Sequence, residues 1–189
     1  MKALGKGSVA SIVEIGLAIA WWLLWIALGG LTLVAFGYGA LHAMIAAGWI
    51  DAEILGGELD LTKGATGAAW PVVVPALVIG AIVIMGGLII VGRLRRLFHN
   101  FTSGEPFRRE NATHLRVIWI TMLVVEVARY VLLGAIAALF AAVDLPDGAK
   151  ADFSFNIDIS TWMSIAILIV LAEVFREGAR MKEEQELTI

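Results

Sequence analysis

Four long apolar stretches constrain the fold of this chain more than any other feature of its sequence. A helix needs about 20 apolar residues to cross the roughly 30 Å hydrocarbon core of a bilayer. The predicted helices cover approximately residues 9–45, 70–101, 109–143 and 159–184. Asp158 and Ser160 are candidate N-caps of the last helix. With 60% hydrophobic and 16% charged residues, the chain has too little polar surface to cover a water-soluble core. The sequence therefore predicts an all-α integral membrane four-helix bundle that forms one transmembrane domain over residues 1–189.

Lysine and arginine residues are distributed unevenly between the two sides of this predicted bundle. Translocated loops are poor in these residues, whereas Asp and Glu contribute little to orientation. Eleven of them fall in the N-terminal tail, the middle loop and the C-terminal tail: Lys2, Lys6, Arg93, Arg95, Arg96, Arg108, Arg109, Arg116, Arg176, Arg180 and Lys182. The two other loops are acidic and hold only Lys63 and Lys150. We therefore expect both termini and the middle loop in the cytoplasm, with the first helix as an uncleaved anchor.

The middle loop, which runs from Arg93 to Arg116 and includes the end of the second and the start of the third predicted helix, is the most distinctive segment of the chain. Gly104 suits the left-handed residue that ends a helix, and Pro106 prevents its continuation. Because buried-type residues such as Phe101 and Phe107 are mixed with the basic residues here, we expect a docking site for a soluble protein. Its candidate residues are Phe101, Gly104, Pro106, Phe107, Arg108, Arg109, Glu110, Asn111 and Arg116. The alternative is that the arginines only set the topology and contact anionic lipid.

The middle loop and the C-terminal segment also carry short motifs that are more specific than apolar helices. These motifs are Ser103-Gly104-Glu105-Pro106-Phe107, Glu110-Asn111-Ala112, Leu115-Arg116, Glu173-Val174-Phe175-Arg176-Glu177-Gly178 and Glu183-Glu184-Gln185-Glu186-Leu187-Thr188-Ile189. Together they resemble DUF2975, a family of small bacterial four-helix membrane proteins without an assigned activity. The resemblance implies a multi-pass protein of the bacterial cytoplasmic (inner) membrane. It also implies a neighbour, because members of the family are often encoded beside a small helix-turn-helix regulator of the Cro/CI type.

The third predicted helix contains a carboxylate and a guanidinium, Glu126 and Arg129, near the middle of the bilayer. Charged side chains at this depth each cost roughly 2.5–3.5 kcal/mol on insertion scales, so they are expected to face other helices and to pair. Their spacing of three residues permits that pairing. Both lie on one helical stripe with Trp119, Met122 and Tyr130. We expect a structural ion pair or, alternatively, an ion, proton or ligand site.

The sequence carries no recognisable catalytic motif. It contains no P-loop, HExxH or GxSxG pattern, and it contains no cysteine. Its three histidines, His42, His99 and His114, are divided between the two predicted sides of the membrane, so we do not expect them to share a metal ion. We therefore predict that the protein is not an enzyme and that it uses neither a metal ion nor a cofactor.

Three functions remain open from the sequence. The leading hypothesis is a regulatory or sensory membrane protein whose middle loop and C-terminal tail bind a soluble, DNA-binding helix-turn-helix regulator, without direct contact to nucleic acid. The second is a small transporter or channel component that uses Glu126 and Arg129. It favours a homo-oligomer, because four helices rarely enclose a sizeable pore alone. The third is a structural assembly subunit. In every case the lipid bilayer is the main partner of the chain.

Overall fold

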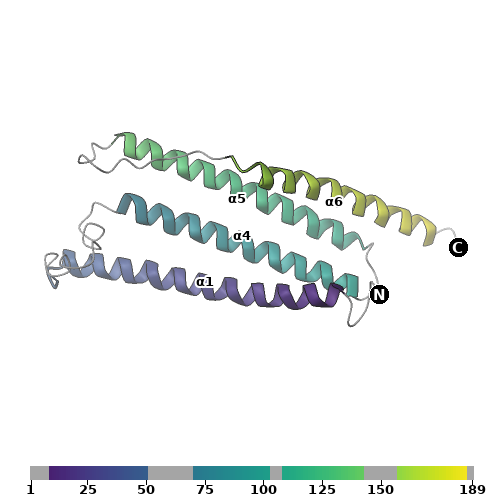
Figure 1. Ribbon diagram of the computed structural model, residues 1–189, viewed down its shortest axis with the longest axis horizontal. Helices are drawn as coiled ribbons and strands as arrows, with labels where there is room; N and C mark the ends of the chain where they lie inside the picture. The colour runs from purple at the N-terminus through teal and green to yellow at the C-terminus, as the bar shows by residue number, and fades with distance from the viewer. Residues whose placement is uncertain (1–8, 51–69, 103–107, 143–156, 187–189) are drawn as a thin grey trace. The chain divides into compact units, whose positions relative to one another are not determined.

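The computed structural model describes residues 9–50, 70–102, 108–142 and 157–186. Almost all of these residues are helical, and none of them lies in a strand. The helices are α1 (Val9–Ala46), α4 (Trp70–Thr102), α5 (Arg109–Ala142) and α6 (Ile159–Glu186) (Figure 1). Each is long and apolar enough to cross a membrane. The predicted all-α class with four such helices is confirmed, and the chain is a multi-pass membrane protein.

The end of α1 is set by a glycine in the left-handed region of backbone space. Gly48 has a φ of 71°, which residues with a Cβ rarely adopt. Its amide donates to the Ile45 carbonyl at 3.0 Å, and the Trp49 amide donates to the Met44 carbonyl at 3.0 Å. These two hydrogen bonds make a Schellman motif, which satisfies carbonyl groups that a helix end leaves without a partner.

The start of α6 is set by a side chain. One carboxylate oxygen of Asp158 accepts a hydrogen bond from the Ser160 amide at 3.0 Å. The other accepts from the Thr161 hydroxyl at 2.7 Å. Asp158 is thus the N-cap of α6, and its negative charge also interacts favourably with the helix dipole.

The chain divides into two compact units. Unit 1 comprises Met1–Trp25, Met85–Glu126 and Asn156–Ile189, and unit 2 comprises Ile26–Ile84 and Val127–Phe155. Unit 1 contains all of α6 with the first part of α1, the last part of α4 and the first part of α5. In unit 2, α4 approaches α1 where a Cβ built on Gly80 would lie 3.4 Å from the Leu31 side chain. The single transmembrane domain stays a prediction.

In unit 1, glycines on α4 allow both neighbouring helices to approach closely. A Cβ built on Gly86 would lie 2.5 Å from Val125 of α5, and one built on Gly92 would lie 3.1 Å from the Trp21 ring of α1. Small residues permit such contacts between membrane helices, because the two backbones can then come close together. Within this unit α4 consequently lies between α1 and α5 (Figure 1).

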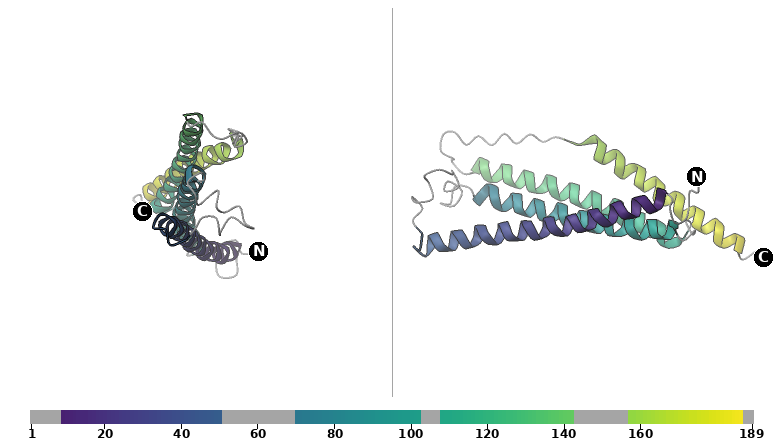
Figure 2. Two further views of the ribbon diagram at one scale, coloured as in Figure 1. Left: turned by 90° about the vertical axis from the view of Figure 1, so that its left-hand side faces the viewer. Right: turned by 60° about the horizontal axis from the view of Figure 1, so that its bottom comes forward.

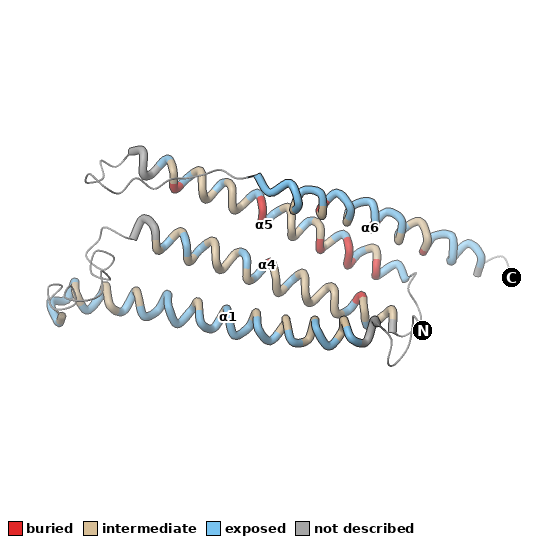
Figure 3. The backbone as a smooth tube through the Cα atoms, in the orientation of Figure 1, coloured by how far each residue is buried: buried red, intermediate tan, exposed pale blue. Residues whose placement is uncertain are grey.

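The buried core of unit 1 lies where α4, α5 and α6 meet. It consists of Leu97, Leu115 and Ala172, one from each helix. The rings of Phe101 and Phe175 stack beside it with their centroids 5.9 Å apart. Buried residues are concentrated on α5, whereas α1 shows only exposed and intermediate residues (Figure 3). Beyond this core, the last turns of α6 extend past the adjacent ends of α4 and α5 (Figure 2).

Candidate functional site

Two of the residues predicted for docking serve the interior of unit 1. Phe101 is half-buried and stacks on Phe175 of α6. Asn111 is fully buried, and its Oδ1 accepts a hydrogen bond of 2.7 Å from Asn100 Nδ2 of α4. Both side chains therefore hold the end of α4 against its neighbours and present little surface to a partner. Three other predicted docking residues lie outside the described part of the chain: Gly104, Pro106 and Phe107.

The remaining predicted docking residues are exposed. They are Arg108, Arg109, Glu110 and Arg116. Arg109 Nε lies 3.1 Å from Glu183 Oε1, so the start of α5 is linked to the tail of α6. An ion pair this exposed contributes only about 0–1 kcal/mol to stability. Arg116, by contrast, forms no ion pair with any residue that the structure describes.

A groove of about 850 Å³ runs between α5 and α6 in unit 1. We call it the α5–α6 groove. Its lining residues are Arg109, Ala112, Thr113, Arg116 and Trp119 of α5 and Ile169, Ala172, Glu173, Arg176, Glu177 and Arg180 of α6. The arginines outnumber the glutamates, so the rim is basic, while the tryptophan, isoleucine and alanine form an apolar floor. Such a groove can accept an acidic segment that also carries apolar side chains.

The two α6 arginines of this groove are already paired within their own helix. Arg176 binds Glu173 through two guanidinium nitrogens, and its Nε donates to Oε2 at 3.0 Å. Arg180 lies 2.6 Å from Glu177 and 3.5 Å from Glu184. Pairs at these spacings neutralise the charge locally. The basic character of the groove therefore comes mainly from the α5 side, where Arg116 lies.

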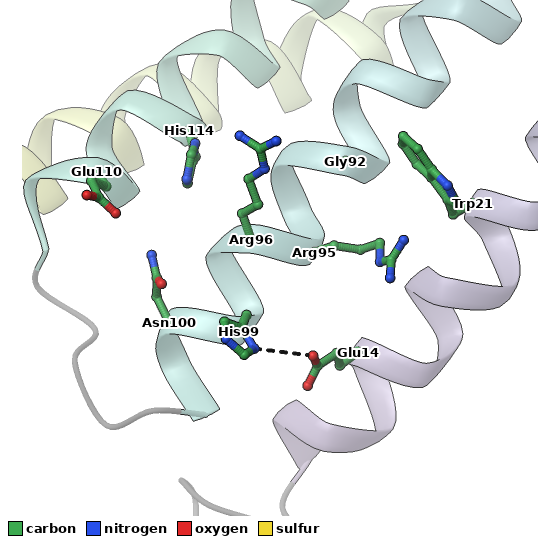
Figure 4. A pocket seen from close by; sticks show the side chains of 9 residues that line it. All are labelled: Glu14, Trp21, Gly92, Arg95, Arg96, His99, Asn100, Glu110 and His114. Carbon is green, nitrogen blue, oxygen red and sulfur yellow. Dashed lines mark ion pairs between the residues drawn. The ribbon is translucent and has the colours of Figure 1, made fainter.

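A cavity of about 670 Å³ lies between α1, α4 and α5 in unit 1 (Figure 4). We call it the α1–α4–α5 cavity. Its lining residues are Glu14, Trp21, Gly92, Arg95, Arg96, His99, Asn100, Glu110 and His114. On the side of α1 the polar groups have partners. The Arg95 guanidinium lies 5.7 Å from the centroid of the Trp21 ring, and His99 Nδ1 lies 3.6 Å from Glu14 Oε1.

On the opposite side of this cavity, polar groups of α4 and α5 face one another. Arg96 and Asn100 extend from α4 toward α5, which carries Glu110 and His114 (Figure 4). His114 is only 9% exposed, and its buried Nδ1 has no hydrogen-bond partner among the described residues. Arg96 is exposed and forms no ion pair with the residues described. On this side of the cavity, the Arg96 guanidinium thus has no ion-pair partner and the His114 Nδ1 has no hydrogen-bond partner among the described residues.

Sequence reasoning missed Arg96 and His114 as members of one site. Arg96 was counted only for topology, and His114 was considered only as a metal ligand. A signal was nevertheless present, because Arg96 and Asn100 on one helix and Glu110 and His114 on the next are each four residues apart. Residues at that spacing share a helix face. Within the described part of the chain, no group of three His, Cys, Asp or Glu side chains is placed to hold a metal ion.

The two charged residues predicted inside the membrane lie in different surroundings. Glu126 belongs to unit 1 and is only 6% exposed. Arg129 belongs to unit 2 and is half-buried, with its guanidinium carbon 5.0 Å from the centroid of the Tyr130 ring. The guanidinium also donates to the Tyr130 hydroxyl at 3.4 Å. A pair between Glu126 and Arg129 stays a prediction.

Comparison with known proteins gives one match. Residues 60–189 match the family model described as Protein of unknown function (DUF2975). The matched range contains α4, α5 and α6, and therefore both walls of the α5–α6 groove and two of the three walls of the α1–α4–α5 cavity. No curated protein and no solved structure matches the chain.

Proposed function

Because the chain belongs to the DUF2975 family of proteins of unknown function, its role has to be inferred from its own residues, and we propose a non-enzymatic regulatory protein that binds a soluble partner in the α5–α6 groove. The observation that carries the proposal is Arg116. It is an exposed cation at the edge of an apolar-floored groove, and no described residue neutralises it. Unpaired charge at the rim of a concave surface steers a partner of opposite charge and fixes its register.

The chemistry of the groove defines the partner. Its apolar floor of Trp119, Ile169 and Ala172 suits one or two apolar side chains, and its basic rim suits carboxylates. An amphipathic helix with an acidic face satisfies both requirements, since helix-in-groove binding uses apolar anchors at helical spacing. We propose that a small helix-turn-helix regulator supplies this helix and that membrane binding controls its access to DNA. The chain itself would then not contact nucleic acid.

The proposal places the groove in the cytoplasm of a bacterium. Eleven lysine and arginine residues in the two tails and the middle loop, against two in the other loops, support a cytoplasmic location for both termini. The membrane is then the bacterial cytoplasmic (inner) membrane. A soluble DNA-binding partner is available only on that side, so the topology and the partner are mutually consistent.

Site-specific photocrosslinking tests the groove directly. A photoreactive amino acid replaces Thr113, an exposed groove residue, in the full-length chain. The cells also produce a small helix-turn-helix regulator of the Cro/CI type, the partner class that is proposed. We expect an adduct of the two proteins after illumination. The matched control carries the same photoreactive residue at Val124, which is 58% exposed on the same helix but lies outside the groove, about three turns further along α5, and it should give no such adduct.

Charge reversal supplies the second part of this test. Arg116→Glu should lower the yield of the Thr113 adduct by roughly fivefold or more, because an exposed ion pair contributes up to about 1 kcal/mol and reversal adds repulsion. Lys182→Glu changes the same charge on α6 outside the groove and should leave the yield unchanged. Equal yields from the Thr113 and Val124 positions, or equal losses in the two charge variants, would rule the groove out.

A transport function is the second candidate, because Glu126 is a buried carboxylate in a helix that is long and apolar enough to cross a membrane. Buried carboxylates in membrane helices commonly mark ion or proton pathways. On this hypothesis the purified chain in liposomes conducts protons or small ions, and Glu126→Gln abolishes that flux. Val124→Gln introduces the same amide at an exposed position of the same helix and serves as the control. Flux from wild type that equals the leak of protein-free liposomes would remove this candidate.

A further inference from the structure

We propose that the α1–α4–α5 cavity binds the headgroup of a zwitterionic phospholipid, with the phosphate against Arg96 and His114 and the ammonium group against Glu110. The required chemistry is a phosphate diester that carries a primary ammonium group, as in phosphatidylethanolamine. This inference is independent of the proposed docking function, because the cavity and the α5–α6 groove share no lining residue.

The unsatisfied groups on the α5 side of the cavity point to a ligand with hydrogen-bonding oxygens. His114 is nine-tenths buried, and its Nδ1 has no hydrogen-bond partner among the described residues. A buried polar atom without a partner is costly, so native structures rarely retain one unless a ligand, ion or water satisfies it. Arg96 lines the same cavity and has no carboxylate partner in the described chain. A guanidinium and an imidazole that converge on one space provide suitable donors for phosphate oxygens.

The carboxylates of the cavity favour a zwitterion over a simple anion. Glu14 is engaged by His99 at 3.6 Å, and Arg95 is held over the Trp21 ring. Among the residues that line the cavity on the side facing α5, one guanidinium, Arg96, and one carboxylate, Glu110, then remain. An anionic headgroup would gain the guanidinium but would be repelled by the carboxylate. A phosphate with an attached ammonium group complements both charges.

The position of the cavity favours a lipid as the source of this headgroup. Arg96 follows the apolar part of α4, where positive residues mark the interfacial region of the bilayer. The same stretches of α1 and α4 that carry the lining residues Trp21 and Gly92 also expose large apolar side chains, including Ile19 and Trp22 of α1 and Ile89 of α4. Acyl chains can lie against these side chains while the headgroup occupies the cavity. Soluble phosphoethanolamine would fill only the polar part and leave this apolar surface unused.

Native mass spectrometry of the full-length, delipidated chain tests the proposal by titration. The probes are dioleoyl phosphatidylethanolamine, dioleoyl phosphatidylglycerol of the same chain length, and soluble O-phosphoethanolamine. We expect saturable binding of one phosphatidylethanolamine, with lower affinity for the other two probes. Arg96→Gln should weaken phosphatidylethanolamine binding about tenfold, as expected for the loss of a charge-assisted hydrogen bond. Arg96 is exposed, so this variant should keep the fold.

Two further variants make the test specific. Glu110→Gln should weaken phosphatidylethanolamine binding and leave phosphatidylglycerol binding equal or stronger, because only the ammonium group loses its partner. Lys182→Gln removes a positive charge of unit 1 outside the cavity and should bind like wild type. The proposal is overturned if Arg96→Gln and Glu110→Gln retain wild-type affinity, if wild type prefers phosphatidylglycerol, or if soluble phosphoethanolamine binds as tightly as the lipid.

Discussion

Asn111 is the least exposed polar side chain in the described part of the molecule. It lies at the start of α5, and its Oδ1 accepts the Asn100 hydrogen bond that joins α5 to α4. The sequence predicts Asn111 as a docking residue because it lies in the middle loop, whereas the structure buries it in a contact between α4 and α5. A buried amide can be important because it holds two helices together, without touching any partner.

Replacing this amide should destabilise the protein. Asn111→Leu removes the acceptor and leaves the Asn100 amide group without it, at a cost of about 1–3 kcal/mol in the free energy of unfolding. Thr113→Val, at an exposed position of the same turn, should change the free energy of unfolding by less than about 0.5 kcal/mol. Unfolding of the purified protein in detergent, followed by far-UV circular dichroism, measures both. Equal effects of the two substitutions would contradict the structural role.

At this scale, sequence reasoning found part of the site. The cluster of basic residues in the middle loop predicts Arg109 and Arg116 as site residues, and both line the α5–α6 groove. Arg96 and His114 were not joined, because they come from different helices, and which faces of two helices meet depends on packing. Hydropathy and charge counts contain no information about that. The sequence indicated only that Arg96 and Asn100 share one helix face and that Glu110 and His114 share another, because each pair is four residues apart.

At the scale of the element, α4 is the helix that α1 and α5 approach most closely within unit 1. Gly86 faces α5 and Gly92 faces α1, so opposite sides of one helix are adapted to close approach. The consequence is that a methyl group has a very different effect at different glycines. Where a neighbouring helix is close, the added methyl group must push that helix away, which destabilises the protein. Where the surface is open, the methyl group only improves the helix propensity of the residue.

Alanine substitutions at two glycines test this difference. Gly86→Ala would place its Cβ 2.5 Å from the short, branched side chain of Val125, and we expect a loss of about 1–3 kcal/mol in unfolding free energy. Gly30→Ala meets no atom within 4 Å and should be neutral or stabilising by up to about 1 kcal/mol. Thermal unfolding in detergent compares them. Adding Val125→Ala to the first variant should restore stability, and absence of any rescue would argue against this contact.

The helices themselves were predictable, but their contacts were not. A long apolar stretch predicts a membrane helix because lipid cannot form hydrogen bonds with the backbone, so the backbone groups must bond to each other. The Asp158 cap was predictable because its side chain can accept hydrogen bonds at a helix start. In lipid, however, an apolar side chain suits the bilayer as well as another helix, so hydropathy does not identify the packed face. Ile118 is buried and Ile120 is 37% exposed, although the two residues are identical in type and only two positions apart on α5.

At the scale of the whole molecule, the charge distribution predicts an orientation that labelling can measure. The chain contains no cysteine, so single cysteines report without interference. Ile157→Cys, just before α6, should react with a membrane-impermeant maleimide in intact cells. Lys182→Cys, near the other end of α6, should react only after the membrane is opened. The reverse pattern would place the groove outside the cytoplasm and exclude a soluble DNA-binding partner.

Throughout its described length, α1 contains no buried residue, in contrast to α4, α5 and α6. Substitutions are selected against when they remove packing contacts between helices. On α1 few positions make such close contacts, and Trp21 and Leu24, which approach glycines of α4, are examples. Most of α1 needs only to stay apolar, and many different apolar sequences meet that requirement equally well. Over evolutionary time, α1 should therefore accumulate neutral substitutions faster than the other helices and lose detectable similarity between homologues first.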